Sequence, residues 1–278
     1  MRLAASKYWI PIGLILASCA SPVIGKGIVV KPARLQISSE PGAAGGGRLT
    51  VSATTTEKTR VRVSVEDFIL AEDGQPQRAV GIAGEHSAAS EVLVDPAEFT
   101  LQGGRDETVL VHCRPRPAAT GPYWALLVFD VEGVPVSDTG GRSTLVASRI
   151  LVPVFGNAGV ARSGDLRVAE LSGQKPVNGL CRARAVVENS GGAILEVIPE
   201  WVLFRRFKGR TEEVVRRASA SVLILPGGRR RLESSFDCSQ VPEEGLGVYL
   251  SIRYGEDSGS RAEATAPLSP SEGSPAKN

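Results

Sequence analysis

Residues 108–130 read Thr-Val-Leu-Val-His-Cys-Arg-Pro-Arg-Pro-Ala-Ala-Thr-Gly-Pro-Tyr-Trp-Ala-Leu-Leu-Val-Phe-Asp, and this stretch decides the fold class. Val109, Val111 and Cys113 share one parity, which is the period of a half-buried strand. A segment rich in proline and glycine then interrupts the pattern, because proline lacks the N–H that a central strand donates. A second apolar and aromatic run, 123–129, follows. The stretch therefore predicts two antiparallel strands joined by a stiff connection.

Short apolar runs separated by Gly/Pro turns recur along the chain, and no helical period competes with them. We expect strands at 28–38, 48–54, 59–70, 92–94, 99–101, 143–155, 166–171, 180–188, 201–207, 212–217, 221–225, 229–236, 247–254 and 261–267. Two arrays of about seven strands predict an all-β fold made of two tandem immunoglobulin-like β-sandwiches.

The expected domains are 27–156 and 165–268, and the glycine-containing stretch 156–165 is the candidate linker. The Ser/Pro/Gly/Lys-rich tail, 269–278, has the composition of a disordered segment.

The amino terminus has the features of an export signal. Basic residues precede an apolar run, 8–17, that is too short to span a bilayer comfortably. The run ends in Leu-Ala-Ser-Cys (16–19), which looks like a bacterial lipobox. In that resemblance the peptide is cut before Cys19, whose thiol then carries lipid and can attach the protein to a membrane. Ordinary secretory cleavage after Ala20 is the alternative. Either reading makes 1–18 a signal peptide and predicts a protein of the periplasm or a lipid-anchored protein of the outer membrane.

The chain has four cysteines. If Cys19 is lipidated, three remain for an oxidising compartment. Cys181 and Cys238 are each in phase with apolar residues on strands expected to be neighbours, so they form either a disulfide or two small buried thiols. Cys113 is expected to be a lone core residue.

Composition gives little material for catalysis. The net charge is +2, and the chain has two histidines and one methionine. His112 and Cys113 adjoin in sequence, but neighbours on a strand point to opposite faces and cannot form a nucleophile–base pair. No metal-ligand spacing appears, so we expect no metal, no cofactor and no enzyme activity. The basic and aromatic residues of 201–210 predict an exposed basic hairpin, not a nucleic-acid site.

The first domain resembles the N-terminal domain of periplasmic PapD-like pilus-assembly chaperones over about residues 27–155. The stretches that carry the resemblance are Val-Lys-Pro-Ala-Arg-Leu (30–35), Arg-Val-Arg-Val-Ser-Val (60–65), 96–101, 108–114, Gly-Pro-Tyr-Trp-Ala (121–125) and Ser-Arg-Ile-Leu (148–151). The second domain looks generically immunoglobulin-like.

The resemblance implies a partner and a site. In that family a basic pair anchors the carboxyl terminus of a pilus or surface-assembly subunit that lacks a strand, and the last strand of the first domain adds to the subunit's sheet. A donated strand satisfies the unpaired backbone groups and the apolar groove of such a subunit. By position the basic pair maps to Arg34 and Arg149. The candidate donor-strand residues are Leu145, Ala147, Ile150 and Leu151.

One departure supports a second hypothesis. The family's donor strand carries several alternating large apolar residues ahead of its basic anchor, whereas here only Leu-Val-Ala (145–147) follows the stretch 140–144. The alternative function is a structural or adhesive envelope lipoprotein with immunoglobulin-like binding modules. The chaperone hypothesis predicts an exposed edge at 145–152 and a basic cleft between the domains. The alternative predicts a covered edge and arginines that do not converge.

Overall fold

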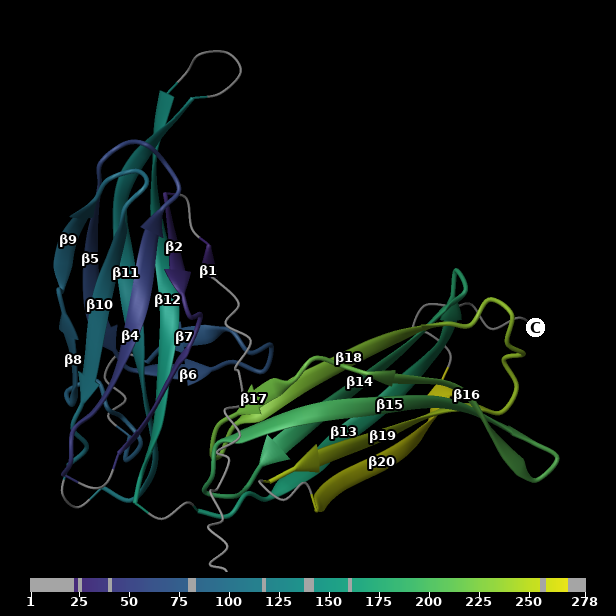
Figure 1. Ribbon diagram of the computed structural model, residues 1–278. Coiled ribbons are helices and arrows are strands. Elements are labelled where there is room, and N and C mark those ends of the chain that lie inside the picture. The colour runs from purple at the N-terminus through teal and green to yellow at the C-terminus, as the bar shows by residue number, and fades with distance from the viewer. Residues whose placement is uncertain are drawn as a thin grey trace, which may run out of the picture.

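A computed structural model describes residues 23–24, 27–39, 42–79, 84–116, 119–137, 143–159, 162–255 and 259–269. The predicted signal peptide, Cys19 and residues 270–278 of the predicted tail lie outside the described residues. Every regular element in these ranges is a strand. The described residues therefore contain no helix that is long and apolar enough to cross a membrane. The predicted fold class, all-β with two tandem immunoglobulin-like domains, is confirmed (Figure 1).

The first domain is a sandwich of two five-stranded sheets. One sheet has the order β1-β2-β4-β10-β8, with the bounds Val23–Ile24, Ile28–Lys31, Gly45–Ala53, Asp106–Cys113 and Val92–Asp95. The other has the order β3-β12-β11-β5-β9, with the bounds Leu35–Ser39, Ser143–Ala158, Gly121–Ser137, Thr59–Glu66 and Glu98–Leu101. Alternate residues of both sheets fill one apolar core, as in Val109, Val111 and Cys113 of β10.

The predicted pairing of 108–113 with 123–129 is wrong. β10 pairs with β4 and β8, whereas β11 pairs with β5 and β12 in the opposite sheet. The proline-containing connection therefore carries the chain across the sandwich instead of closing a hairpin. β11 is also longer than the predicted run 123–129, because it continues to Ser137, and β12 begins at Ser143. Their long hairpin projects beyond the rest of the domain (Figure 1).

The second domain is built on one strand path, β16-β15-β19-β20-β13-β14-β18, with β17 paired to β15. The bounds in chain order from β13 to β20 are Leu166–Val177, Leu180–Asn189, Leu195–Phe207, Arg210–Ala218, Val222–Ile224, Arg229–Asp237, Leu246–Tyr254 and Ser260–Ser269. β13 and β20 pair in parallel, with the register Gly173↔Leu268 and Gln174↔Ser269. The path folds over a core that includes the fully buried Trp201 and Phe236.

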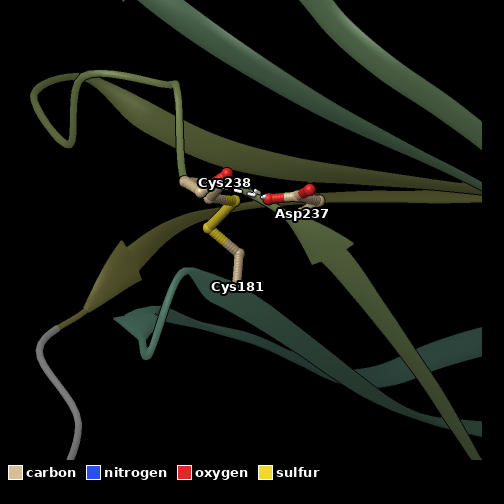
Figure 2. The surroundings of a disulfide bond; sticks show 4 residues. Cys181, Asp237 and Cys238 are labelled. Atoms are coloured by element: carbon tan, nitrogen blue, oxygen red, sulfur yellow. Dashed lines mark hydrogen bonds between the residues drawn. A yellow bond between two sulfur atoms is a disulfide. The ribbon is translucent and has the colours of Figure 1, made fainter.

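A disulfide joins Cys181 on β14 to Cys238, which directly follows β18 (Figure 2). These two strands are hydrogen-bonded neighbours. The carboxylate of Asp237 accepts hydrogen bonds from the backbone N–H and the hydroxyl of Ser239, which keeps the turn after β18 close to the disulfide. Cys113 is a buried free thiol in the first domain.

The two domains share an apolar interface. Phe68, Leu126, Val128 and Phe155 of the first domain form a buried cluster with Leu225 of the second. This contact explains why β11 is buried on both faces: Leu127 and Phe129 face the sandwich core, while Leu126 and Val128 face the other domain.

A hairpin of the first domain reinforces this interface. β6 (Phe68–Leu70) and β7 (Pro76–Arg78) reach toward β17 and β18 (Figure 1). At the hairpin turn, the backbone N–H of Arg231 donates to Glu72 O at 2.7 Å. The Arg230 guanidinium donates to Ala71 O and Glu72 O, each at 3.4 Å. The two sandwiches are therefore held together by backbone groups as well as by apolar packing.

Candidate functional site

The second edge of strand β12 is only partly paired. β12 pairs with β11 along most of its length, but on its other side β3 pairs only with Val154–Ala158. None of the described strands pairs with that side over residues 143–147 and 149–153, although β1 passes close to β12. We call this stretch the open edge of β12. It spans about 35 Å at about 3.3 Å per residue. Unpaired backbone groups along such an edge form a template for an added strand.

The open edge ends where β3 begins, and the sequence explains this limit. The segment 28–38, predicted as a strand broken by Pro32, is two strands, β2 and β3, which belong to opposite sheets. Pro32 lies at the break between them, where proline cannot continue a ladder. The chain crosses the sandwich there and enters beside Val154, so a strand added along the open edge would end near Arg34.

A cleft of about 770 Å³ lies between the domains at this end of β12. Its lining includes Arg34 and Arg162 as well as Glu196 from the second domain. Arg34 Nη2 donates to both carboxylate oxygens of Glu196, at 3.1 and 3.0 Å. The hydroxyl of Ser221 donates to the same carboxylate at 2.9 Å. Glu196 thus holds Arg34 in place across the cleft.

Arg162 is the second cation of the cleft. Its Nη2 donates to the Thr120 carbonyl oxygen at 3.2 Å, and none of the described carboxylates forms a salt bridge with it. The side chain lies against glycines: a Cβ built at Gly121 would lie 2.7 Å from Nε, and one at Gly192 would lie 2.7 Å from Cδ. The glycines therefore make room for a guanidinium that can bind an anion. Arg162 lies in the predicted linker, 156–165, and no role was predicted for it. The available signal was a lone arginine in a connection that contains glycine and serine.

The structure does not bring Arg149 to Arg34, so the predicted basic pair is wrong in one member. Arg149 lies on the outer face of the sheet, where its Nε donates to Asp130 Oδ1 at 2.6 Å. This hydrogen bond raises the pKa of Arg149 above its usual range. Arg34 is level with Pro153, because the next residue, Leu35, pairs with Val154. Four residues of strand separate it from Arg149, which amounts to about 13 Å.

The predicted donor-strand residues have different surroundings. Ile150 is 2% exposed and packs in the core of its own sandwich, so it cannot fill a groove in another protein. Leu151 packs against the cluster between the domains. Ala147 is exposed. Leu145 pairs through its backbone with Pro135, and its side chain lies outside the described residues. These differences follow from the two-residue period of a strand, because the even-numbered positions of β12 face the core and the odd-numbered ones face outward.

A row of alternating charges crosses the outer face of the same sheet. Arg149, Asp130, Arg62 and Glu98 are lateral neighbours on β12, β11, β5 and β9. Arg62 Nε lies 3.6 Å from Glu98 Oε2. Asp130 and Arg62 each have an opposite charge on both sides of the row, whereas Arg149, at the open edge, has one on its inner side only. Its side chain is 49% exposed.

The two histidines lie in different surroundings. His112 is exposed and Cys113 is buried, on opposite faces of β10 as predicted. His86 stacks on Trp124 and its Nδ1 lies 2.8 Å from Pro122 O. Within the described ranges, no three His, Cys, Asp or Glu side chains come together in a group that could hold a metal ion.

Comparisons with known proteins add structural neighbours but no family. No protein-family model matches the chain, and no curated protein matches it either. The solved class 5 fimbriae chaperone CfaA is similar at 13% identity and a TM-score of 0.43, over 87% of this chain and 99% of that chain. The structure of the Salmonella enterica SafA pilin in complex with the SafB chaperone is similar at 12% identity and a TM-score of 0.42, over 88% and 98%. The solved Pseudomonas aeruginosa CupB2 chaperone is similar at 13% identity and a TM-score of 0.36, over 85% of this chain and 97% of that chain. At these TM-scores the function has to be argued from the geometry of this chain.

Proposed function

We propose that this chain is an exported, chaperone-like protein that binds an incomplete β-sheet subunit of a pilus or surface assembly by strand addition. The observation that carries the proposal is the open edge of β12, which ends at the cleft lined by Arg34 and Arg162. An edge alone is common, but an edge that ends at two guanidinium groups suits a strand with a free carboxyl terminus.

The added strand would run parallel to β12, in line with β3. Its backbone would pair with the open edge, and its last residue would stop beside Arg34, because β3 occupies the line from Val154 onward. Arg162 would bind the terminal carboxylate first, since no described carboxylate pairs with it. Arg34 would bind it as well once its salt bridge with Glu196 opens. Charge-assisted hydrogen bonds to the carboxylate would fix the register of the whole strand.

Export belongs to the same proposal. A lipid on Cys19 would hold the protein at a membrane, only a few residues before β1 (Val23–Ile24). The protein would then act in the periplasm or at the outer membrane, where a subunit arrives unfolded and needs its missing strand.

Site-specific photo-crosslinking tests the edge. A photoreactive residue at Ala147, exposed on β12, is compared with one at Thr100, exposed on β9 at the opposite edge of the same sheet. With envelope extract of the source organism, we expect crosslinks to a β-rich subunit from position 147 and none from position 100. Equal crosslinking from both positions, or none from either, would contradict strand addition at β12.

A second experiment removes the two arginines of the cleft. Arg34→Ala/Arg162→Ala should lower recovery of the crosslinked subunit at least about tenfold, because hydrogen bonds to charged groups contribute about 1.5–3 kcal/mol each. Arg182→Ala/Arg184→Ala, two exposed arginines of β14, is the matched control.

A structural or adhesive envelope lipoprotein is the second candidate. It is favoured by two observations. Arg34 and Arg149 do not converge, as this function predicts, and Ile150 and Leu151 are committed to the protein's own packing, so the edge offers few free apolar side chains. Crosslinks to polysaccharide or to a folded surface protein, unaffected by the cleft variant, would support this function instead.

A further inference from the structure

The charge row on the outer face is incomplete at the open edge. Arg149 is its last member on β12, and Asp130 is its one carboxylate neighbour within the row. Glu66, outside the row, adds a weaker attraction. A strand added to the open edge would place one residue laterally next to Arg149 on the same face, since lateral neighbours in a sheet point the same way. An acidic side chain there would give Arg149 a carboxylate on both sides, as Arg62 has, whereas a basic one would face a guanidinium directly.

The neighbouring rows add to the pattern. Leu151 lies on the same face as Arg149, two residues along, and packs against the apolar cluster between the domains. Ile150 faces the sandwich core from the other side. A residue added beside either one would extend an apolar surface, so the positions that follow the acidic residue favour apolar side chains.

We propose that the strand which adds to the open edge of β12 carries an acidic side chain beside Arg149, followed by apolar residues. This inference rests on the proposed function. With the carboxyl terminus level with Val152 or Pro153, the acidic residue stands about three or four positions before the terminal one, by strand geometry. The partner's recognition segment is thus an acidic-then-apolar carboxyl-terminal strand.

The test uses the full-length protein and fluorescently labelled peptides of about eight residues, the length of an ordinary strand. The peptides share a Val/Thr strand sequence and carry Glu, Gln or Lys at the third or fourth position before the last residue. Fluorescence polarisation gives their affinities. We expect Glu peptides at one of the two positions to bind about three- to tenfold more tightly than their Lys counterparts, and this preference to shrink as salt is raised.

Variants at Arg149 assign the preference to that residue. Arg149→Gln should abolish it and Arg149→Glu should reverse it. Arg48→Glu, the same charge change on β4 of the opposite sheet, should leave it unchanged. Because Arg149→Glu faces Asp130, circular dichroism and thermal unfolding of each variant establish that the fold is kept; Arg149→Gln remains informative if the reversed charge unfolds the domain.

The outcomes separate the two proposals. Peptides that bind through a free carboxylate and protect residues 143–153 from hydrogen exchange, but show no preference between Glu and Lys, would overturn this inference and leave the proposed function standing. Binding that is indifferent to amidation of the peptide terminus and gives no protection of β12 would overturn the proposed function and this inference with it. A dimer seen by sedimentation, with β12 protected by a second copy and closed to all peptides, would also overturn both.

Discussion

At the scale of single residues, Tyr123 and Gly156 fix β3 against β12. The Tyr123 hydroxyl donates to Ile37 O at 2.8 Å and lies 3.2 Å from Ser39 Oγ. A Cβ at Gly156 would lie 2.1 Å from Tyr123 Cζ and 2.2 Å from Ile37 O, so only glycine fits there. This close approach holds the end of the open edge in place.

Gly156→Ala should therefore destabilise the protein by about 3 kcal/mol, the upper part of the range for overpacking, because one of the two clashes is with backbone. Urea unfolding measures the change. Gly84→Ala is the control, since a Cβ there meets nothing within 4 Å. Equal stability of the two variants would contradict the packing described at the end of β12.

Stability should also depend on pH through Tyr123. Burial raises the pKa of Tyr123 to about 12, whereas the pKa of a tyrosine in the unfolded chain is about 10. The folded state therefore holds its proton more tightly, and the free energy of unfolding should be constant below about pH 10 and fall from about pH 10 to 12. Burial also raises the pKa of Tyr249, so Tyr123→Phe should reduce this slope without removing it. An unchanged slope in urea titrations of Tyr123→Phe would contradict the assignment.

At the scale of elements, the disulfide between β14 and the end of β18 closes a long segment of the second domain. The two cysteines are 57 residues apart in sequence. In the chain-entropy description, removing a cross-link of this span costs about 4 kcal/mol of stability. Cys181→Ala/Cys238→Ala should show a loss of this size in non-reducing urea unfolding. A reductant should destabilise the wild-type protein by a similar amount and leave the double variant unaffected.

Periodicity predicted most strands, because a sandwich face reads directly as alternation. The buried positions of β10 and of β14 are those that alternate with polar residues in the sequence. Pairing was harder to predict. Nothing local distinguishes a proline-rich connection that closes a hairpin from one that crosses between sheets, so the partner of β10 was missed.

The site was predicted only in part, for a similar reason. Arg34 lines the cleft, Arg149 lies on the outer face of its sheet, and Arg162, for which no role was predicted, also lines the cleft. Which arginine enters the cleft depends on the register of β3 on β12 and on the path of the linker past Gly121 and Gly192. Both are long-range facts that no short stretch of sequence encodes.

At the scale of the whole molecule, the β6–β7 hairpin sets how the domains meet. The guanidinium of Arg230 lies over the hairpin turn, and burial lowers the pKa of Arg230 from its usual value. Arg230→Ala would remove these contacts while keeping the backbone hydrogen bond of Arg231. We expect a broader distance distribution by small-angle X-ray scattering and weaker binding at the cleft. Arg253→Ala, an exposed arginine of β19, is the control; identical scattering from the two variants would show that Arg230 does not restrain the domains.

The buried thiol of Cys113 has a consequence for how the chain matures. A polypeptide that emerges amino terminus first can complete the first sandwich before Cys238 is available, since domains fold as units in chain order. Cys113 is by then fully enclosed. Of the three pairings that Cys113, Cys181 and Cys238 allow, only the one inside the second domain remains within reach of an oxidant. When the first sandwich closes first, Cys113 is withdrawn from competition and Cys181 is left to pair with Cys238.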